Sequence, residues 1–335
     1  MIAASPLRDQ PERWQEALRD AITDPAELLR ILGLDLALLG PAQSAAARFP
    51  LRVPRGFVSR MRRGDAHDPL LRQVLPLGQE LIETPDFVAD PVGDLPSATA
   101  PGLLHKYQGR ALLVATGACG VHCRYCFRRE FPYAEHLTGS ARFKPALELI
   151  GRDPSVSEVI LSGGDPLSLS NARLMELGAA LDGISHLRRL RIHTRQPIVL
   201  PERVDTGLLD WLASRRLATV MVVHANHPAE IDEAVVTALH AVAARGVTLL
   251  NQSVLLKGVN DSADTLQELS ERLAEGRVLP YYLHLLDRVR GAAHFEVTES
   301  RGRELIEALR ERLPGYLVPR LVREQAGAGS KTPVA

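Results

Sequence analysis

The chain has 335 residues, a length that fits either about two domains or one α/β barrel. Its 40 Lys and Arg balance its 40 Asp and Glu, so no overall basic charge attracts nucleic acid or anionic lipid. Hydrophobic residues make up 45% and charged residues 24%, which excludes extensive disorder. No apolar run approaches the roughly 20 residues of a membrane helix, and the first residues lack a secretory signal. We therefore expect a cytoplasmic protein without nucleic-acid or membrane partners.

Residues 1–105 differ in pattern from the rest of the chain and are predicted to form an N-terminal arm, helical at first and then irregular and rich in proline. Apolar residues at a spacing of four predict helical structure within 11–30, and Asp24-Pro25 is typical of the start of a second helix. One more short helix is indicated at 70–75. Because the arm has little periodic apolar sequence, we expect it to lack a core of its own and to wrap over a larger body.

Short apolar runs alternate with helical patterns through the middle of the chain. Strands are predicted at 111–115, 159–161, 190–194, 219–224, 247–254 and 278–283. Helices are predicted between them around 145–150, 174–181, 208–212, 235–242 and 266–273. About six β-α units in a row imply an α/β fold with a parallel sheet and right-handed crossovers. The pattern leaves open a doubly wound sheet and a complete or partial barrel, but either fold gathers function at the C-terminal ends of its strands.

All three cysteines lie in one loop directly after the first of these strands, with the spacing Cys119-x3-Cys123-x2-Cys126. Thiolates this close together can converge on one soft metal centre. A four-iron cluster held by three cysteines leaves one iron open to a small molecule. The alternatives are a zinc site completed by His122 or His136, or three unrelated buried cysteines.

The cysteine spacing resembles the signature of the radical S-adenosylmethionine (SAM) superfamily. Its partial (β/α)6 barrel also matches the six predicted units. The resemblance implies a 4Fe-4S cluster on the three cysteines, with SAM bound at the open iron. The segment Gly163-Gly164-Asp165 closes the second strand and is similar to the superfamily's segment that binds the methionine amino group. Glycines allow the backbone to approach a ligand closely, and a carboxylate can pair an ammonium group.

Further segments, in the same order, resemble lysine 2,3-aminomutases, which also use pyridoxal 5'-phosphate (PLP). They lie at 101–110, 127–129, 224–230, 251–261, 281–287, 291–295 and 327–333. The resemblance covers nearly the whole chain after residue 65 and is nearest to the short branch that supplies β-lysine for modification of translation elongation factor P. It implies an isomerase that converts L-lysine to β-lysine. It further implies an electron donor such as flavodoxin or ferredoxin and a functional link to elongation factor P and its lysine ligase.

The same resemblance assigns cofactor residues. Lys331, in a glycine-rich tail, matches the lysine that links covalently to PLP, and Arg110 matches an arginine at the PLP phosphate. His224 and Gln252 match polar residues near SAM. Residues 106–296 would form the barrel and 297–335 a C-terminal helix with the PLP-binding tail. Arg195 also follows a strand and faces the same end, but the resemblance assigns it no role.

Three residues are assigned to the substrate. Arg128 matches the arginine that holds the α-carboxylate, while Asp287 and Glu324 match the acids around the ε-ammonium. Glu324 stands where the family has aspartate, so its arm is one methylene longer. The rival hypotheses are a 2,3-aminomutase for another amino acid and a non-catalytic metal or partner-binding module. A basic stretch within 52–63 is predicted to be a solvated face, the alternative being a docking surface for an acidic partner.

Overall fold

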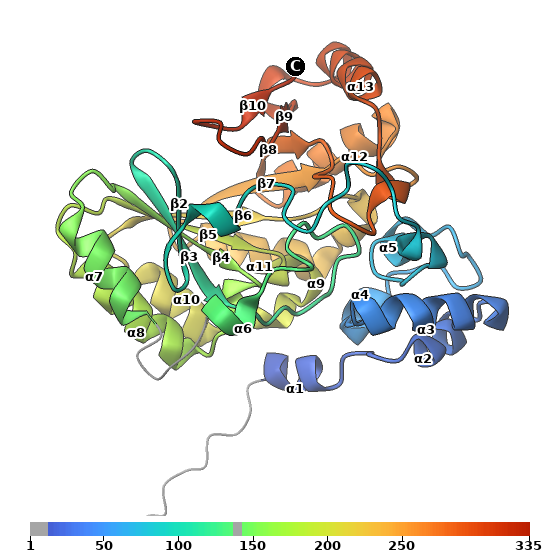
Figure 1. The fold of residues 1–335 in the computed structure, drawn as a ribbon, viewed down its shortest axis with the longest axis horizontal. Coiled ribbons are helices and arrows are strands. Elements are labelled where there is room, and N and C mark those ends of the chain that lie inside the picture. Colours follow the sequence, from blue (N-terminus) through green and yellow to red (C-terminus); the bar gives the residue numbers. More distant parts are fainter. Residues whose placement is uncertain (1–12, 137–142) are drawn as a thin grey trace, which may run out of the picture.

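The computed structural model describes residues 13–136 and 143–335. Its ten strands form one sheet in chain order, β1 to β10, which curves with helices around its outer face (Figure 1). The six predicted strands are all confirmed: β3 (Arg110–Thr116), β4 (Glu158–Gly163), β5 (Arg189–Thr194), β6 (Ala218–Val223), β7 (Thr248–Val254) and β8 (Leu279–His284). The apolar runs in β3, β4 and β6 suit strands that are covered on both faces, whereas buried and less buried residues alternate along β5 and β7.

The strand order distinguishes a barrel from a doubly wound sheet. Each strand from β3 to β9 (Arg320–Arg323) pairs in parallel with the next one along the chain. Because every right-handed crossover then adds its strand in the same direction, the helices collect on one face and the sheet curls around the other. The sheet ends at β1 (Ala98–Ala100) and β10 (Thr332–Pro333), so the fold is a partial (β/α)6 barrel with additional edge strands.

Amphipathic helices cover the outer face of the barrel. They are α7 (Lys144–Arg152), α8 (Asn171–Asp182), α10 (Thr206–Ala213), α11 (Glu233–Ala243), α12 (Ala263–Glu275) and α13 (Glu299–Arg312). All but α7 begin at a Ser, Thr or Asp whose side chain accepts a hydrogen bond from the third helical amide, as Asp205 does at the start of α10. The apolar stripes of α7, α8, α10 and α11 pack in the main core, that of α13 packs in a second cluster with β8 and β9, and α12 contributes to both.

The N-terminal arm lies beside the barrel and contains α1 (Arg13–Arg19), α2 (Pro25–Leu32), α3 (Leu39–Arg48), α4 (Arg55–Val58) and α5 (Pro69–Arg72) (Figure 1). The predicted start of α2 is confirmed, because Asp24 accepts from Ala26 N at 2.9 Å. The expectation that the arm lacks a core was wrong. Trp14, Phe57 and Leu70 are buried in a hydrophobic cluster drawn almost wholly from the arm, which only a few barrel residues such as Val121 join.

Two antiparallel additions extend the edges of the barrel, and neither was predicted from the sequence. At one edge, β2 (Leu103–Tyr107) pairs with β3 and β1 pairs with β2. At the other edge, β10 pairs with β9, with Thr332 opposite Arg323. The second pairing returns the C-terminal tail to the sheet and so fixes the position of the tail lysine.

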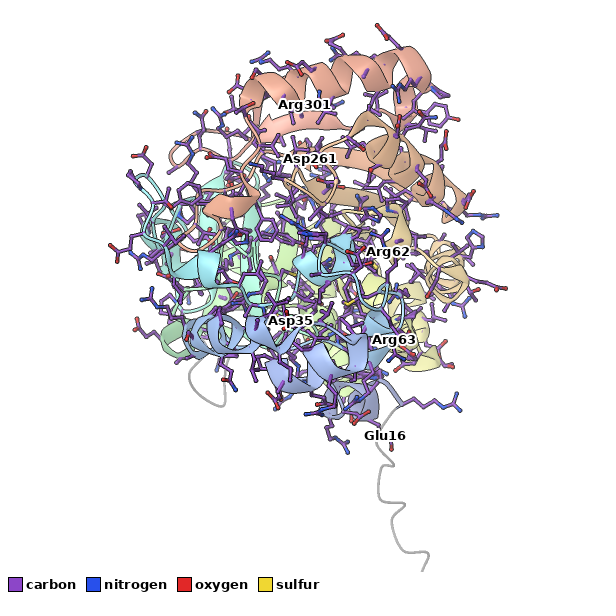
Figure 2. All side chains as sticks on the ribbon, turned by 90° about the vertical axis from the view of Figure 1, so that its right-hand side faces the viewer. Glu16, Asp35, Arg62, Arg63, Asp261 and Arg301 are labelled. Atoms are coloured by element: carbon purple, nitrogen blue, oxygen red, sulfur yellow. The ribbon has the colours of Figure 1, made fainter. Side chains whose placement is uncertain are left out.

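The basic stretch of the arm is largely neutralised by its own surroundings. Arg55 and Arg62 each lie within 3.0 Å of an acidic side chain of the arm. Arg52 and Arg60 donate to main-chain carbonyls. Figure 2 faces this side of the molecule and shows Arg62 beside Arg63. The prediction of a solvated face holds for Arg55 and Arg62, which are exposed, whereas the side chain of Arg60 is largely buried. No helix in the described part of the chain is long and apolar enough to cross a membrane.

Candidate active site

The cysteine loop follows β3 at the C-terminal end of the barrel. Cys119, Cys123 and Cys126 are partly exposed free thiols. Arg124 anchors the loop from within, because its Nε and Nη2 lie 2.8 and 2.6 Å from the carboxylate of buried Glu80. The loop is therefore held in place while its thiols remain accessible, as a cluster-binding loop requires.

The zinc alternative was tested at the two predicted histidines. His122 Nδ1 lies 2.9 Å from the carbonyl oxygen of Pro50, and its ring stacks on Phe49. The side chain of His136 lies outside the described residues. Within 13–136 and 143–335, no group of three His, Cys, Asp or Glu side chains is arranged to hold a single metal ion. His122 thus serves to attach the loop to the arm.

The glycine segment after β4 lies against the main chain that leads into the cysteine loop. Gly164 N donates to Thr116 O at 2.6 Å, and Asp165 N donates to Ala118 O at 2.8 Å. A Cβ atom on Gly164 would lie 2.5 Å from Ala118 O, so only glycine fits. Gly163 has a φ of 108°, which also favours glycine. The predicted SAM segment and the cysteine loop are therefore joined by direct backbone contact.

The carboxylate of Asp165, which the sequence predicts to pair with the SAM amino group, is engaged by groups of the neighbouring segments. Its carboxylate accepts four hydrogen bonds, from Thr194 Oγ1 at 2.7 Å and from the amides of Leu167, Arg195 and Gln196 at 2.8–3.2 Å. Burial raises the pKa of Asp165, although these hydrogen bonds act in the opposite direction. Asp165 thus ties the end of β4 to the end of β5, and the two preceding glycines present the backbone.

Unpaired polar atoms converge on the concave face of the barrel. Leu190 and Ile192 pack towards the helices, so alternation directs His193 to the opposite face. His193 Nε2, His224 Nε2, Gln252 Oε1 and His284 Nε2 are buried and have no hydrogen-bond partner among the described residues. His193 and His284 were not predicted as site residues from the sequence. The signal that could have identified them is a polar residue near the C-terminal end of a predicted strand.

These buried imidazoles are neutral at physiological pH. Burial, together with the charges of Arg195 and Lys331, lowers the pKa of His224 to about 3. The rings of His193 and His224 lie 5.7 Å apart in an edge-to-face arrangement. Unpaired buried polar groups are costly unless a ligand satisfies them. The arrangement therefore fits a polar molecule such as SAM beside the cysteine loop.

The C-terminal tail brings Lys331 to the same opening. Lys331 Nζ lies 3.0 Å from Glu324 Oε2, and the hydroxyl of Tyr107 donates to the other oxygen of Glu324. The guanidinium of Arg110 lies 4.5 Å from the ring centre of Tyr107. The predicted PLP residues Lys331 and Arg110 are thus linked through Tyr107 and Glu324. A primary amine near an arginine fits an aldehyde cofactor that carries a phosphate.

The two predicted acids have different electrostatic states. Burial raises the pKa of Asp287 to about 7, and the nearby charge of Glu324 adds to this while Lys331 opposes it. Burial also disfavours ionised Glu324, but the charge of Lys331 and the hydrogen bond from Tyr107 prevail and lower its pKa. Asp287 and Glu324 therefore lie close enough to influence each other, and the charge of Lys331 acts on both.

Arg128 is buried and already has an acidic partner. Its Nε lies 2.6 Å from Asp94 Oδ2, and its Nη1 lies 3.0 Å from Ser162 Oγ, beside the glycine segment. Lys106 pairs with the other oxygen of Asp94. Asp94 was missed in the sequence because it lies in the irregular part of the arm. It orients the guanidinium of Arg128 towards the end of β4.

The site has two parts that define the radical SAM class. Three cysteines follow the first parallel strand of a partial (β/α)6 barrel, and backbone contacts join them to a glycine-rich turn after the second strand.

No protein-family model matches the chain. It is 48% identical to the L-lysine 2,3-aminomutase of Escherichia coli, over 96% of this chain and 94% of that protein. The Haemophilus influenzae enzyme of the same name is 43% identical over 99% of this chain and 98% of that protein. The Clostridium subterminale enzyme is 35% identical over 96% of this chain and 77% of that protein. The chain belongs to the L-lysine 2,3-aminomutase family.

One solved structure gives a weaker match. A radical SAM methyltransferase from Sphaerobacter thermophilus aligns with a TM-score of 0.46 and 18% identity, over 66% of this chain and 68% of that chain.

Proposed function

We propose that the protein is an L-lysine 2,3-aminomutase, an isomerase that converts L-lysine to β-lysine by moving the amino group from C2 to C3. The observation that carries this proposal is the convergence of the cysteine loop and Lys331 on one barrel opening. The cysteine loop follows β3, and Glu324, which pairs with Lys331, follows β9. Both strands pair in parallel with their neighbours in one sheet, so the loop and the lysine lie at the same C-terminal end of the barrel. A radical source and a lysine-bound carbonyl cofactor would therefore share one site.

Each cofactor has a set of residues whose chemistry fits it. Cys119, Cys123 and Cys126 would hold a 4Fe-4S cluster. SAM would be contacted by Gly163, Gly164, His224 and Gln252. Asp165 would hold the two glycines in position through its hydrogen bonds to the end of β5. Lys331 and Arg110 would hold PLP. When bound, the cluster and SAM supply a carbon radical, and PLP supplies a conjugated ring that stabilises unpaired electron density.

Arg128, Asp287 and Glu324 would orient the substrate between the cofactors. Arginine presents a planar fork to the α-carboxylate. Glu324 already holds an alkylammonium group, that of Lys331, with 3.0 Å between Nζ and Oε2. The ε-ammonium of lysine is the same chemical group, so the acids suit a substrate with a distal amine. An acidic substrate would leave these two carboxylates without a cation.

We also propose the partners that the resemblance implies. A small electron donor such as flavodoxin or ferredoxin would reduce the cluster. The β-lysine product would then be attached to elongation factor P by its lysine ligase. The near full-length match to a short relative, at 94% coverage of the E. coli protein, supports assignment to that branch.

The decisive test is product analysis. Protein reconstituted anaerobically with iron, sulfide and PLP should convert L-lysine to β-lysine in the presence of SAM and a strong reductant. Omission of SAM, or the variant Cys123→Ala, should abolish the product. Formation of a different β-amino acid would identify an aminomutase of other specificity. Failure to bind iron would instead indicate a non-catalytic module.

A further inference from the structure

A buried polar network lies directly behind the cysteine loop and has no role in the proposed function. Its centre is Arg195, which follows β5 and is 6% exposed. Arg195 Nη1 lies 2.8 Å from the sulfur of Cys123. Its Nη2 donates to Glu230 Oε2 at 3.0 Å and to Gln73 Oε1 at 2.6 Å. Each terminal nitrogen of the guanidinium therefore has a partner, and one partner is a proposed cluster ligand.

The network holds this guanidinium in one orientation. Glu230 is fully buried, and its Oε1 accepts from the amides of Asn226 and His227 at 3.0 and 3.1 Å. Gln73 Nε2 donates to the same oxygen at 2.9 Å. Gln73 belongs to the arm, directly after α5, so the arm closes the network from outside the barrel. A charged group fixed in this way keeps its contact without reorganisation.

The main chain of Arg195 connects the network to the glycine segment. Arg195 N donates to Asp165 Oδ2 at 2.8 Å. The same residue therefore contacts the cysteine loop through its side chain and the glycine segment through its backbone. Arg124, within the cysteine loop itself, directs its side chain to Glu80 and to arm carbonyls instead.

We propose that Arg195 is a positioning residue that donates a hydrogen bond to the Cys123 ligand and raises the reduction potential of the iron–sulfur cluster. Reduction adds one electron, and a cationic hydrogen bond to a ligand sulfur stabilises the more negative state. Glu230 offsets part of that positive charge and so moderates the potential. The inference rests on the proposed function only in requiring that the three cysteines bind a cluster.

The test is the midpoint potential of the cluster in SAM-free holoprotein, followed by electron paramagnetic resonance. Arg195→Gln should lower the potential, Arg195→Lys should lower it less, and Glu230→Gln should raise it. The matched control is Arg203→Lys, because Arg203 is equally buried but donates to Leu167 O and Leu169 O. The cluster potential of Arg203→Lys should stay at the native value. General loosening of the loop would not shift the potential in opposite directions in the Arg195 and Glu230 variants.

A second measurement begins with the native protein. In native holoprotein labelled with 15N in the arginine guanidinium, the reduced cluster should show a 15N hyperfine coupling, which Arg195→Lys should remove. Full iron content with neither a coupling nor a potential shift would overturn the inference and leave the proposed function standing. Native protein that takes up no iron would overturn both.

Discussion

Lys331 Nζ and Glu324 Oε2 lie 3.0 Å apart, although neither residue belongs to the parallel barrel. Pairing between β9 and β10 closes the seven-residue interval between them and places both at the barrel opening. Tyr107, from β2 at the other edge of the sheet, donates to the same carboxylate. The two edge additions thus meet at one ion pair, which holds the proposed PLP lysine in place before the cofactor binds.

Lys331→Ala should abolish the covalent attachment of PLP and leave the cluster intact. The lysine lies on the tail, whereas the cysteine loop is anchored separately through Arg124 and Glu80. After borohydride reduction, peptide mapping should find PLP on Lys331 in the native protein and on no peptide in the variant. Lys257→Ala, an exposed lysine, is the control and should behave as native. Reduced cofactor on a different lysine would contradict the assignment of the tail.

Asp287→Asn should severely impair lysine turnover while sparing both cofactors. Removal of one partner from a buried charge pair costs about 3–5 kcal/mol. Since about 1.4 kcal/mol corresponds to tenfold in rate, kcat/KM should fall at least about a hundredfold. Glu324→Asp keeps the charge and should have a smaller effect. Steady-state kinetics with lysine tests both variants, and near-native kinetics for Asp287→Asn would place the ammonium site elsewhere.

Asp287 should also make the cofactor-free protein less stable as the pH rises. Burial raises its folded-state pKa to about 7, whereas an unfolded aspartate has a pKa of about 3.9. Between these values the folded protein holds a proton that the unfolded chain has released. Stability therefore falls as pH rises through this window and levels off above about pH 7, by at most about 4 kcal/mol.

Thermal melts of the cofactor-free protein from pH 4 to 8 would measure this effect. Asp287→Asn lacks the titrating group, so its stability relative to native should increase across the window. Glu324→Gln should leave the slope within this window nearly unchanged. Although burial opposes them, Lys331 and the Tyr107 hydrogen bond lower the folded-state pKa of Glu324 below the usual value of 4.5, so its contribution to stability changes only at more acid pH. Parallel melting curves for native protein and Asp287→Asn would show that Asp287 is ionised in the folded state.

The central strands and their helices were predictable because each has a local signature. Strands β3, β4 and β6 contain continuous apolar runs, and Asp24 and Asp205 stand at helix starts where their side chains accept hydrogen bonds from backbone amides. The cysteine loop was equally clear from its spacing. In each case, residues close in sequence determine the local structure.

The remaining features depend on contacts between distant segments. The short strands β9 and β10 have no long apolar run. They form because β9 pairs with β8 on one side and with β10 on the other, which satisfies their backbone hydrogen bonds. The core of the arm is assembled from short helices and loops, so no single window shows a period. Likewise, the sequence predicts only a ligand's ammonium group as the partner of the Asp165 carboxylate, whereas donors from β5 and beyond engage it in the fold. Its pairing could not be inferred from its neighbours alone.

Gly164→Ala should separate the glycine segment from the cysteine loop. The new Cβ would lie 2.5 Å from Ala118 O and 2.8 Å from the carbonyl carbon of Gly117, both of which are main chain. Relief of such overpacking costs typically about 1–3 kcal/mol and moves the backbone. We therefore expect a lower melting temperature and, in holoprotein, SAM binding weakened by more than tenfold with iron content retained.

Gly151→Ala is the matched control for this prediction. Gly151 lies within α7, and a Cβ atom there would have no neighbour within 4 Å. Because alanine is the better helix former, that variant should gain about 0.5–1 kcal/mol in stability and bind SAM as the native protein does. Calorimetry gives the stabilities, and equilibrium binding of SAM to the reconstituted protein gives the affinities. If Gly164→Ala bound SAM with native affinity, the backbone contact between the glycine segment and the cysteine loop would have no part in forming the SAM site.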